Sequence, residues 1–308
     1  MRIITIGTDT AVKVEVPMCA CIGYFDGMHK GHQALAAKTV EMAGKYQCET
    51  ALITFDPDPW VTIKGIEDVQ HISTMQQRIR RCEDFGIQNV VILKFTKEMS
   101  AQEPEVFVRN TLGKLNLKGL VCGFDFHYAS KGKGNLETLR RDADYEIQVV
   151  DAVTDEEGKI SSTRITACIE NGEMEKAAAM LGCWFTIEGT VIHGRHRGTS
   201  MGFPTANIKY SSEYLMPAPG VYAGYASVNN ERWPAMINLG HNPTMNYREH
   251  MSLEAHLIGF EGSVYDRGIA VEFVSFMRPE IKFAGTDELI AQLRKDVINV
   301  TERLKEYE

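Results

Sequence analysis

The chain has 308 residues, of which 44% are hydrophobic and 24% charged, a composition typical of a globular protein. This length exceeds one typical hydrophobic core and indicates about two domains. No apolar run of the sequence approaches the ~18 residues of a membrane helix, and the first residues contain no signal-peptide core, so we expect a cytoplasmic protein. The formal net charge of -8 disfavours broad electrostatic binding to nucleic acid or to an anionic membrane surface.

Short β-branched runs alternate with helical segments through the first half of the chain. The predicted strands are 18–22, 50–55, 89–95, 119–126 and 146–153, and the predicted helices are 32–46 and 73–86. Ser73 is a good N-cap for the second of these helices, and Gly86 fits the position just after its end. The alternation predicts an α/β fold with a mainly parallel sheet covered by helices on both faces.

Beyond about Cys183 the pattern changes to short strands separated by turn residues. These strands are predicted at 185–194, 220–228, 232–240, 252–260 and 269–277, which indicates an antiparallel barrel or sandwich. The final segment, 286–307, is predicted to be an amphipathic helix that packs on the barrel, with Thr286 as its N-cap. Its apolar residues are Leu289, Leu293, Val297, Val300 and Leu304.

The seven cysteines are scattered along the chain and include no C-x-x-C pair. This distribution favours neither a disulfide framework nor a zinc site. We therefore expect most of them to be buried, reduced thiols.

The segment GYFDGMHKGH, residues 23–32, follows the first predicted strand and precedes a helix. His29 and His32 are three residues apart at the first helical turn, so both face the same side. This turn lies at the carboxyl edge of a parallel sheet, where α/β proteins bind ligands, and a helix N-terminus offers N–H groups to phosphate. Imidazoles there could stabilise charge that develops on phosphorus, so the pattern predicts nucleotide chemistry. Glycines allow close approach of a ligand at Gly23, Gly27 and Gly31.

Other interpretations of this segment remain open from the residues alone. Asp26-Gly27 could equally form a tight turn that leaves both histidines as surface groups. A metal site is less favoured, because no third ligand lies at a recognisable spacing. SKGKGN at 130–135 lacks the full P-loop pattern and is interpreted as a mobile basic loop.

Residues 23–32 resemble the G-x-F-D-G-x-H-x-G-H signature of prokaryotic FAD synthetases, a branch of the H-x-G-H nucleotidyltransferases. Three further segments follow in that family's order: TFDPDP at 54–59, GFDFHYASKGKG at 123–134 and ISSTRI at 160–165. Taken alone, the last segment is either a phosphate clamp or a helix cap with a solvated arginine.

A second set of polar residues lies in the later half of the chain. The basic run 193–197 offers a cationic loop, and Thr205 and Asn207 would point the same way in an extended chain, where their oxygens suit Mg²⁺. Glu254 would point away from its apolar neighbours and could accept a proton. Taken singly, these residues also fit a capped turn and a solvated position on a barrel exterior.

Together these residues resemble the riboflavin kinase module, with GFPTAN at 202–207, GVYAG at 220–224, NLGHNPT at 238–244 and EAH at 254–256. The chain as a whole is similar to bifunctional riboflavin kinase/FAD synthetases over nearly its full length. The resemblance implies a Rossmann-like H-x-G-H nucleotidyltransferase domain at 1–184. It implies an antiparallel β-barrel riboflavin kinase domain with a C-terminal helix at 185–308.

The resemblance also implies two reactions. ATP would phosphorylate riboflavin to FMN with Glu254 as base, and FMN would attack a second ATP to give FAD and pyrophosphate. The substrates and products are then riboflavin, FMN, ATP and FAD, the cofactor is Mg²⁺, and FAD is a product. The residues so implied are: catalytic, Glu254, His29, His32 and Arg164; nucleotide- or phosphate-binding, Gly23, Phe25, Asp26, Gly27, Gly31, Ser162, Thr163, Gly194, Arg197 and Gly202; flavin-binding, Asp125, Phe126 and Asn242; metal-binding, Thr205 and Asn207.

Four positions of the first half depart from the family pattern: Asp58, His127, Ala129 and Thr166. They bear on the rate and the acceptor specificity of that half more than on those of the kinase. One alternative is a nucleotidyltransferase that acts on another phosphorylated small molecule. The other is a flavin-binding regulatory or scaffold protein in which one or both catalytic sites have decayed.

Overall fold

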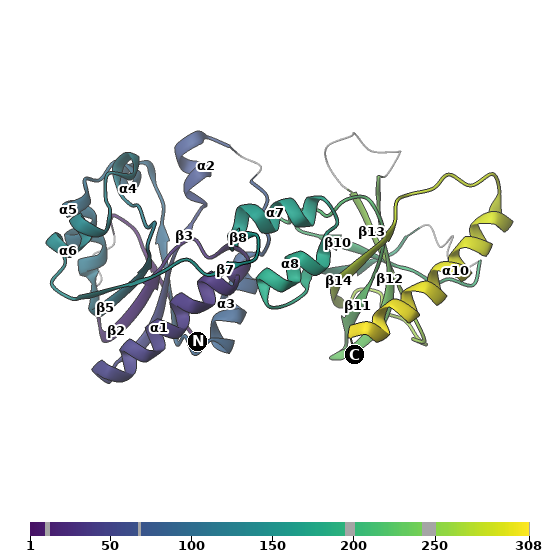
Figure 1. Cartoon of the computed structure of the whole chain (residues 1–308), viewed down its shortest axis with the longest axis horizontal. Coiled ribbons are helices and arrows are strands. Elements are labelled where there is room, and N and C mark those ends of the chain that lie inside the picture. The colour runs from purple at the N-terminus through teal and green to yellow at the C-terminus, as the bar shows by residue number, and fades with distance from the viewer. Residues whose placement is uncertain (10–12, 67–68, 195–200, 242–250, 308) are drawn as a thin grey trace. The chain divides into compact units, whose positions relative to one another are not determined.

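The computed structural model of the chain describes residues 1–9, 13–66, 69–194, 201–241 and 251–307. The chain divides into two compact units, the cavity unit Met1–Ser162 and the barrel unit Thr163–Glu308 (Figure 1). This division falls before the domain boundary expected after residue 184, because helices α7 (Ser162–Glu170) and α8 (Met174–Leu181) group with the barrel.

The cavity unit is built on a six-stranded sheet in which every pairing is parallel, as predicted. The strands lie in the order β1-β4-β3-β2-β5-β6. The strand predicted at 119–126 ends earlier, because the N–H of Phe126 turns back to the carbonyl of Gly123. The strands are β1 (Arg2–Ile6), β2 (Val14–Ile22), β3 (Glu49–Asp56), β4 (Asn89–Lys94), β5 (Leu115–Gly123) and β6 (Glu146–Val150).

Helices cover both faces of this sheet (Figure 1). Along β2, Cys19 and Cys21 pack into the core beneath α1 (Lys30–Tyr46) and α3 (Met75–Asp84), whereas the intervening Ala20 packs into the core of the opposite face. This alternation follows from the two-residue period of a strand. The opposite face is covered by α4 (Lys97–Ser100), α5 (Pro104–Val106), η2 (Phe107–Thr111), η3 (Leu112–Lys114) and α6 (Leu136–Asp142).

The ends of α3 partly correct the sequence prediction. Thr74, not Ser73, is the N-cap, and it forms a capping box with Gln77. The hydroxyl of Ser73 instead accepts the N–H of Gly27 at 2.9 Å. Gly86 has φ +74° directly after the C-cap, as predicted. The remaining elements of this unit are η1 (Asp26–Met28), α2 (Pro59–Lys64), η4 (Ser130–Gly132), β7 (Thr154–Asp155) and β8 (Gly158–Lys159).

The strand order changes direction at β2. From β2 the chain places β3 and then β4 on one side, and it later adds β5 and β6 on the other side. Ligands of open α/β sheets bind in the crevice at such a switch point, beyond the carboxyl ends of the strands. The loops after β2 and β5 are therefore the expected walls of a binding site.

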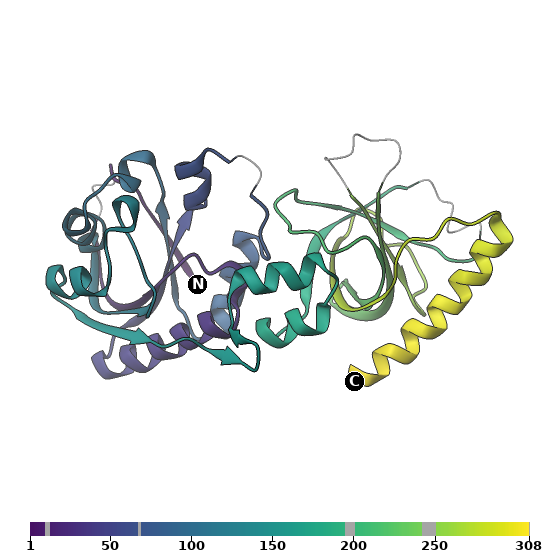
Figure 2. The same cartoon turned by 45° about the horizontal axis from the view of Figure 1, so that its top comes forward.

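The barrel unit contains a closed antiparallel barrel in the order β10-β13-β12-β11-β14-β9, whose strands form a ring in Figure 2. The predicted barrel is thus confirmed, and β10 adds a strand that the sequence prediction did not include. The strands are β9 (Phe185–Ile192), β10 (Ala206–Tyr210), β11 (Gly220–Val228), β12 (Glu231–His241), β13 (Met251–Leu257) and β14 (Gly268–Arg278).

The final helix α10 (Thr286–Leu304), followed by η5 (Lys305–Tyr307), runs along the outside of the barrel (Figure 2). Its Val300 and Leu304 are fully buried in a core shared with β11 and β14, as its amphipathic pattern predicts. Its N-cap is Gly285, so Thr286 is the first helical residue and not the cap. Within the described residues, no helix is long and apolar enough to cross a membrane.

Candidate active sites

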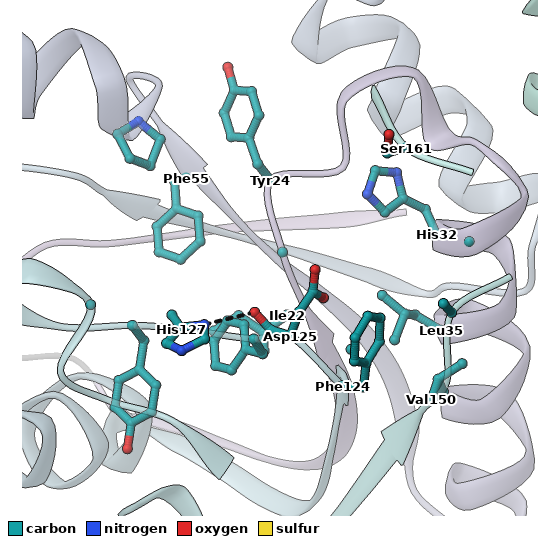
Figure 3. Close-up of a pocket in the computed structure, with 18 of the residues that line it drawn as sticks. Ile22, Tyr24, His32, Leu35, Phe55, Phe124, Asp125, His127, Val150 and Ser161 are labelled. Atoms are coloured by element: carbon teal, nitrogen blue, oxygen red, sulfur yellow. Dashed lines mark hydrogen bonds between the residues drawn. The ribbon is translucent and has the colours of Figure 1, made fainter. Parts of the chain in front are cut away.

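A cavity of about 700 Å³ opens at the switch point of the parallel sheet. Its walls come from α1, from the loops after β2 and β5, and from the segment that precedes α7. Figure 3 shows side chains from these separate segments arranged around the same hollow, including Tyr24, His32, Asp125 and Ser161. The fold therefore brings the H-x-G-H segment to a real cavity.

His29 is both a lining residue and the N-cap of α1. Its Nδ1 accepts the backbone N–H groups of Gly31 at 3.1 Å and His32 at 3.4 Å. The proton of the neutral ring is consequently on Nε2, which can donate to a ligand. A Cβ at position 31 would lie 3.0 Å from the His29 ring, so the glycine there makes room for the imidazole.

The two imidazoles are stacked, with centroids 3.7 Å apart and planes at 19°. Burial lowers the pKa of His29 to about 4, an effect that Asp26 opposes and the charge of Lys159 reinforces. Burial, the neighbouring His29 and the charge of Arg78 hold the pKa of His32 well below its usual value. Nδ1 of His32 is buried without a partner among the described residues. Both rings are therefore neutral near pH 7 and retain hydrogen-bonding capacity for a ligand.

The loop before α1 is held by contacts within the protein. The N–H groups of Gly31 and His32 donate to Nδ1 of His29. Phe25, Asp26 and Gly27 do not line the cavity. Phe25 is fully buried, and the Asp26 carboxylate accepts the N–H groups of Ile72 and Ser73, each at 3.0 Å. These residues fasten the loop to the start of α3 because both carboxylate oxygens are occupied within the protein.

The opposite wall follows β5. Asp125 and Phe126 line the cavity, and Phe126 stacks on Tyr128 with centroids 5.6 Å apart. Nδ1 of His127 lies 2.9 Å from the backbone oxygen of Asp125, as the dashed line in Figure 3 marks. The carboxylate of Asp125 pairs with Lys159, a lining residue that the sequence reasoning missed. Its position directly before the ISSTRI segment is the sequence feature that could have identified Lys159 as a site residue.

The first two serines of the ISSTRI segment lie at the cavity and at the loop that carries His29. Ser161 lines the cavity, and the hydroxyl of Ser162 donates to the backbone oxygen of Asp26 at 3.2 Å. Thr163 and Arg164 lie in the first turn of α7, which belongs to the barrel unit.

In the barrel unit, a row of polar residues crosses three neighbouring strands. Glu254 is the cross-strand partner of Asn207 on β10 and of Asn238 on β12. Leu253 and Ala255 are buried, so Glu254 points out of the barrel as its alternation predicts. The hydroxyl of Thr205 donates to Oε2 of Glu254 at 3.4 Å. Three of the predicted kinase-site residues therefore lie on one outer face.

Glycines make space for this row. A Cβ at Gly194 would lie 2.1 Å from Nδ2 of Asn207, so the amide packs directly on the backbone there. A Cβ at Gly240 would lie 2.4 Å from Oε1 of Glu280. Sequence reasoning did not include Asn238 or Glu280 in the site, although the motif at 238–244 contains the first of them. Gly202 is exposed with φ +85°, and Arg197 and Asn242 lie outside the described residues.

The two units match two family models, the FAD synthetase model over residues 12–164 and the riboflavin kinase model over residues 181–304. A bifunctional riboflavin kinase/FMN adenylyltransferase of Listeria monocytogenes is 38% identical over 285 residues, which cover 92% of this chain and 91% of that protein. The protein of the same name from Escherichia coli K12 is 30% identical, with 94% of each chain covered. The chain belongs to the bifunctional riboflavin kinase/FMN adenylyltransferase family.

A solved structure from Streptococcus pneumoniae, titled as a macrolide-efflux protein, also resembles this family member. It has a TM-score of 0.91 at 29% identity and covers 98% of this chain and 99% of its own.

Two departures from the family pattern have a local description in this structure. Asp58 is the N-cap of α2 and accepts the N–H of Trp60 at 2.7 Å. Ala129 has φ +62° and ψ -168°, a conformation adopted almost only by glycine. The missing glycine at position 129 therefore leaves strained backbone in the cavity wall.

The outward polar row of the barrel unit fits a small, hard cation. It presents the hydroxyl of Thr205, the amide of Asn207 and the carboxylate of Glu254, and oxygen donors of these kinds suit Mg²⁺. The close packing of Asn207 on Gly194 fixes the amide beside the strand. Among the described residues, no group of three or more His, Cys, Asp or Glu side chains could hold a metal ion.

Proposed function

We propose that this chain makes FMN from riboflavin and ATP in its barrel unit, and FAD from FMN and a second ATP in its cavity unit. The proposal rests on one observation, which is that the two units contain different sets of reactive side chains. Paired neutral imidazoles border a cavity in one unit, and an outward carboxylate with hydroxyl and amide neighbours lies in the other. We assign the adenylyltransferase to residues 1–184 and the kinase to residues 185–308.

In the adenylyl transfer, an FMN phosphate oxygen attacks the α-phosphorus of ATP, and the bond to the bridging oxygen of pyrophosphate breaks. Nε2–H of His29 donates to a phosphate oxygen, and His32 supports the same group from the adjoining ring. Arg164, Ser162 and Thr163 add donors from the start of α7. Positioning and electrostatic stabilisation supply most of the acceleration in such transfers, so no covalent intermediate is required.

The loop after β5 binds the flavin or the nucleotide in this proposal, through Asp125 and Phe126. Gly23 and Gly31 line the cavity and have no side chain to obstruct a ligand. Phe25, Asp26 and Gly27 contribute indirectly, because they hold the loop that carries His29.

In the kinase reaction, Glu254 accepts the proton of the terminal ribityl hydroxyl as that oxygen attacks the γ-phosphorus of ATP. The bond from the γ-phosphorus to the bridging oxygen breaks, and ADP leaves. Thr205 and Asn207 would hold Mg²⁺, which neutralises charge on the phosphate oxygens when it is bound. The segment from Gly194 to Gly202, with Arg197, would cover the phosphates, and Asn242 would contact the flavin. The protein would work in the cytoplasm, where its seven cysteines, all thiols in this structure, remain reduced.

The test is to incubate the purified chain with riboflavin, ATP and Mg²⁺ and to separate the flavins by chromatography over time. FMN should appear first and FAD should follow at its expense. Supplied FMN should give FAD without riboflavin. Tight binding of flavin with no consumption of ATP would instead favour a regulatory or scaffold protein.

A further inference from the structure

Lys159 is the one lysine or arginine among the described residues that line the cavity. The lining also includes the carboxylates of Asp125 and Asp151. A site that must bring together an FMN phosphate and a nucleotide triphosphate needs cationic donors, because both substrates are anions. The ammonium of Lys159 can therefore supply the positive charge that the two neutral histidines do not.

The position of Lys159 lets it reach a ligand. It ends strand β8 and directly precedes Ile160 and Ser161, which also line the cavity. Its side chain is 43% exposed, and its Nζ lies 4.8 Å from the ring centroid of Phe124. The ammonium is thus held at the cavity mouth and remains open to solvent and to a ligand.

The carboxylate of Asp125 pairs with Lys159. The Asp125 side chain is 54% exposed, and exposed ion pairs of this kind add little stability because water competes for both partners. A phosphate group carries more negative charge than a carboxylate and offers more acceptor oxygens. A phosphate can therefore replace Asp125 as the partner of the ammonium with little loss of stability.

The ammonium also acts electrostatically on the catalytic histidines. Its charge helps to lower the pKa of both His29 and His32. An effect on both rings means that the ammonium lies within electrostatic range of the two imidazoles. The same charge would attract a phosphate bound beside them.

We propose that Lys159 is a phosphate-binding residue of the adenylyltransferase, which Asp125 holds in the cavity mouth until a substrate phosphate replaces the carboxylate. This inference rests on the proposed adenylyl transfer and adds to it a residue and an exchange of ion-pair partners. The phosphate belongs either to ATP and its pyrophosphate product or to FMN.

The test compares Lys159→Met, Lys159→Arg and Asp125→Asn with the parent. We expect Lys159→Met to raise KM for ATP or for FMN about tenfold to a hundredfold, and the affected substrate identifies the source of the phosphate. Lys159→Arg should stay within a few-fold of the parent. Asp125→Asn removes the competing carboxylate and should tighten inhibition by inorganic pyrophosphate several-fold if the pyrophosphate moiety is the ligand, or inhibition by inorganic phosphate if the FMN phosphate is.

Lys133→Met is the matched control. Lys133 also pairs with an exposed carboxylate of the cavity unit, Glu103 at 2.7 Å, but it does not line the cavity. This variant should match the parent in every measurement. A second readout is independent of turnover: an NMR titration should show a raised pKa for His29 in Lys159→Met, because a nearby positive charge has been removed.

Unchanged KM values and an unchanged His29 titration in Lys159→Met would overturn the proposal, provided that the parent makes FAD from FMN and ATP. Unaltered affinity in Asp125→Asn for both pyrophosphate and inorganic phosphate would overturn the exchange with Asp125. If the parent makes no FAD, the proposed function fails instead. Calorimetry with ATP, FMN and pyrophosphate on parent and Lys159→Met then still decides the role of Lys159.

Discussion

Nδ1 of His29 accepts the backbone N–H of His32 while the two imidazole rings stack face to face. One histidine therefore caps the helix that carries the other and orients both rings toward the cavity. The cap fixes the tautomer of His29, so its only ring N–H points away from the helix backbone. The structural role of the cap and the proposed chemical role of the imidazole belong to the same side chain, and they can be separated by choice of substitution.

His29→Asn should separate them. Asparagine is a good N-cap, so helix α1 should keep its stability, whereas the imidazole donor is lost. We expect FAD formation to fall on the order of 10²- to 10³-fold with FMN formation unchanged. His29→Ala should lose the same activity and also about 1 kcal/mol of stability. Separate assays of the two half-reactions and urea unfolding measure these effects, and FAD formation at the parental rate would remove the imidazole from the mechanism.

Stability of the cavity unit should depend on pH through the same residue. The pKa of His29 is about 4 in the folded protein and near 6.5 when unfolded, so the unfolded chain binds the extra proton between these values. The stabilising contribution is complete above about pH 6.5 and is lost as the pH falls toward 4. The urea midpoint should therefore fall across this window in the parent and fall less steeply in His29→Asn. Identical slopes would show that His29 is not buried as a neutral ring.

Glu254→Gln tests the kinase base. Glutamine keeps the shape of the side chain, and its amide oxygen can still accept from Thr205, but it does not take up a proton. FMN formation should fall on the order of 10²- to 10⁴-fold with little change in the binding of riboflavin or ATP. Conversion of supplied FMN to FAD should continue. A kinase rate within a few-fold of the parent would exclude Glu254 as the base, and joint loss of both activities would indicate misfolding.

Two variants test the metal site, one that removes both proposed ligands and one that leaves them in place. Thr205→Ala/Asn207→Ala should strongly weaken Mg²⁺-dependent phosphorylation. Gly194→Ala should weaken it as well, because a Cβ there would lie 2.1 Å from the Asn207 amide and must displace it. Lys209→Ala, an exposed change further along β10, is the control and should leave the Mg²⁺ titration unchanged. A parental titration in the double variant would mean that these two residues are structural.

Ala129→Gly should stabilise the protein. The φ of +62° and ψ of -168° at Ala129 cost about 1–3 kcal/mol for a residue with a Cβ, whereas glycine loses roughly 0.5–1 kcal/mol of backbone entropy. The net gain should be about 1 kcal/mol in urea unfolding. Ala101→Gly, at an exposed position with an ordinary helical conformation, should instead destabilise. Equal effects at the two positions would contradict the strained conformation of Ala129.

The sequence by itself determined the local elements and the order of the chemical segments. The two-residue alternation along β2 and the amphipathic period of α10 are set by which apolar side chains are buried. Both patterns can be recognised in the sequence alone. The parallel sheet, the barrel and the outward direction of Glu254 followed from them. Helix ends were less certain, as Thr74 and Gly285 show, because several adjacent residues could serve as a cap.

Only the tertiary structure decided which distant residues share a site. The bond of Asp26 to Ile72, the pair of Lys159 with Asp125 and the row from Asn207 through Glu254 to Asn238 all join segments remote in sequence. These contacts depend on the order of strands in the sheet and on strand register. Neither is set by local propensity, because a strand of given pattern can pair with several neighbours until the whole core is packed.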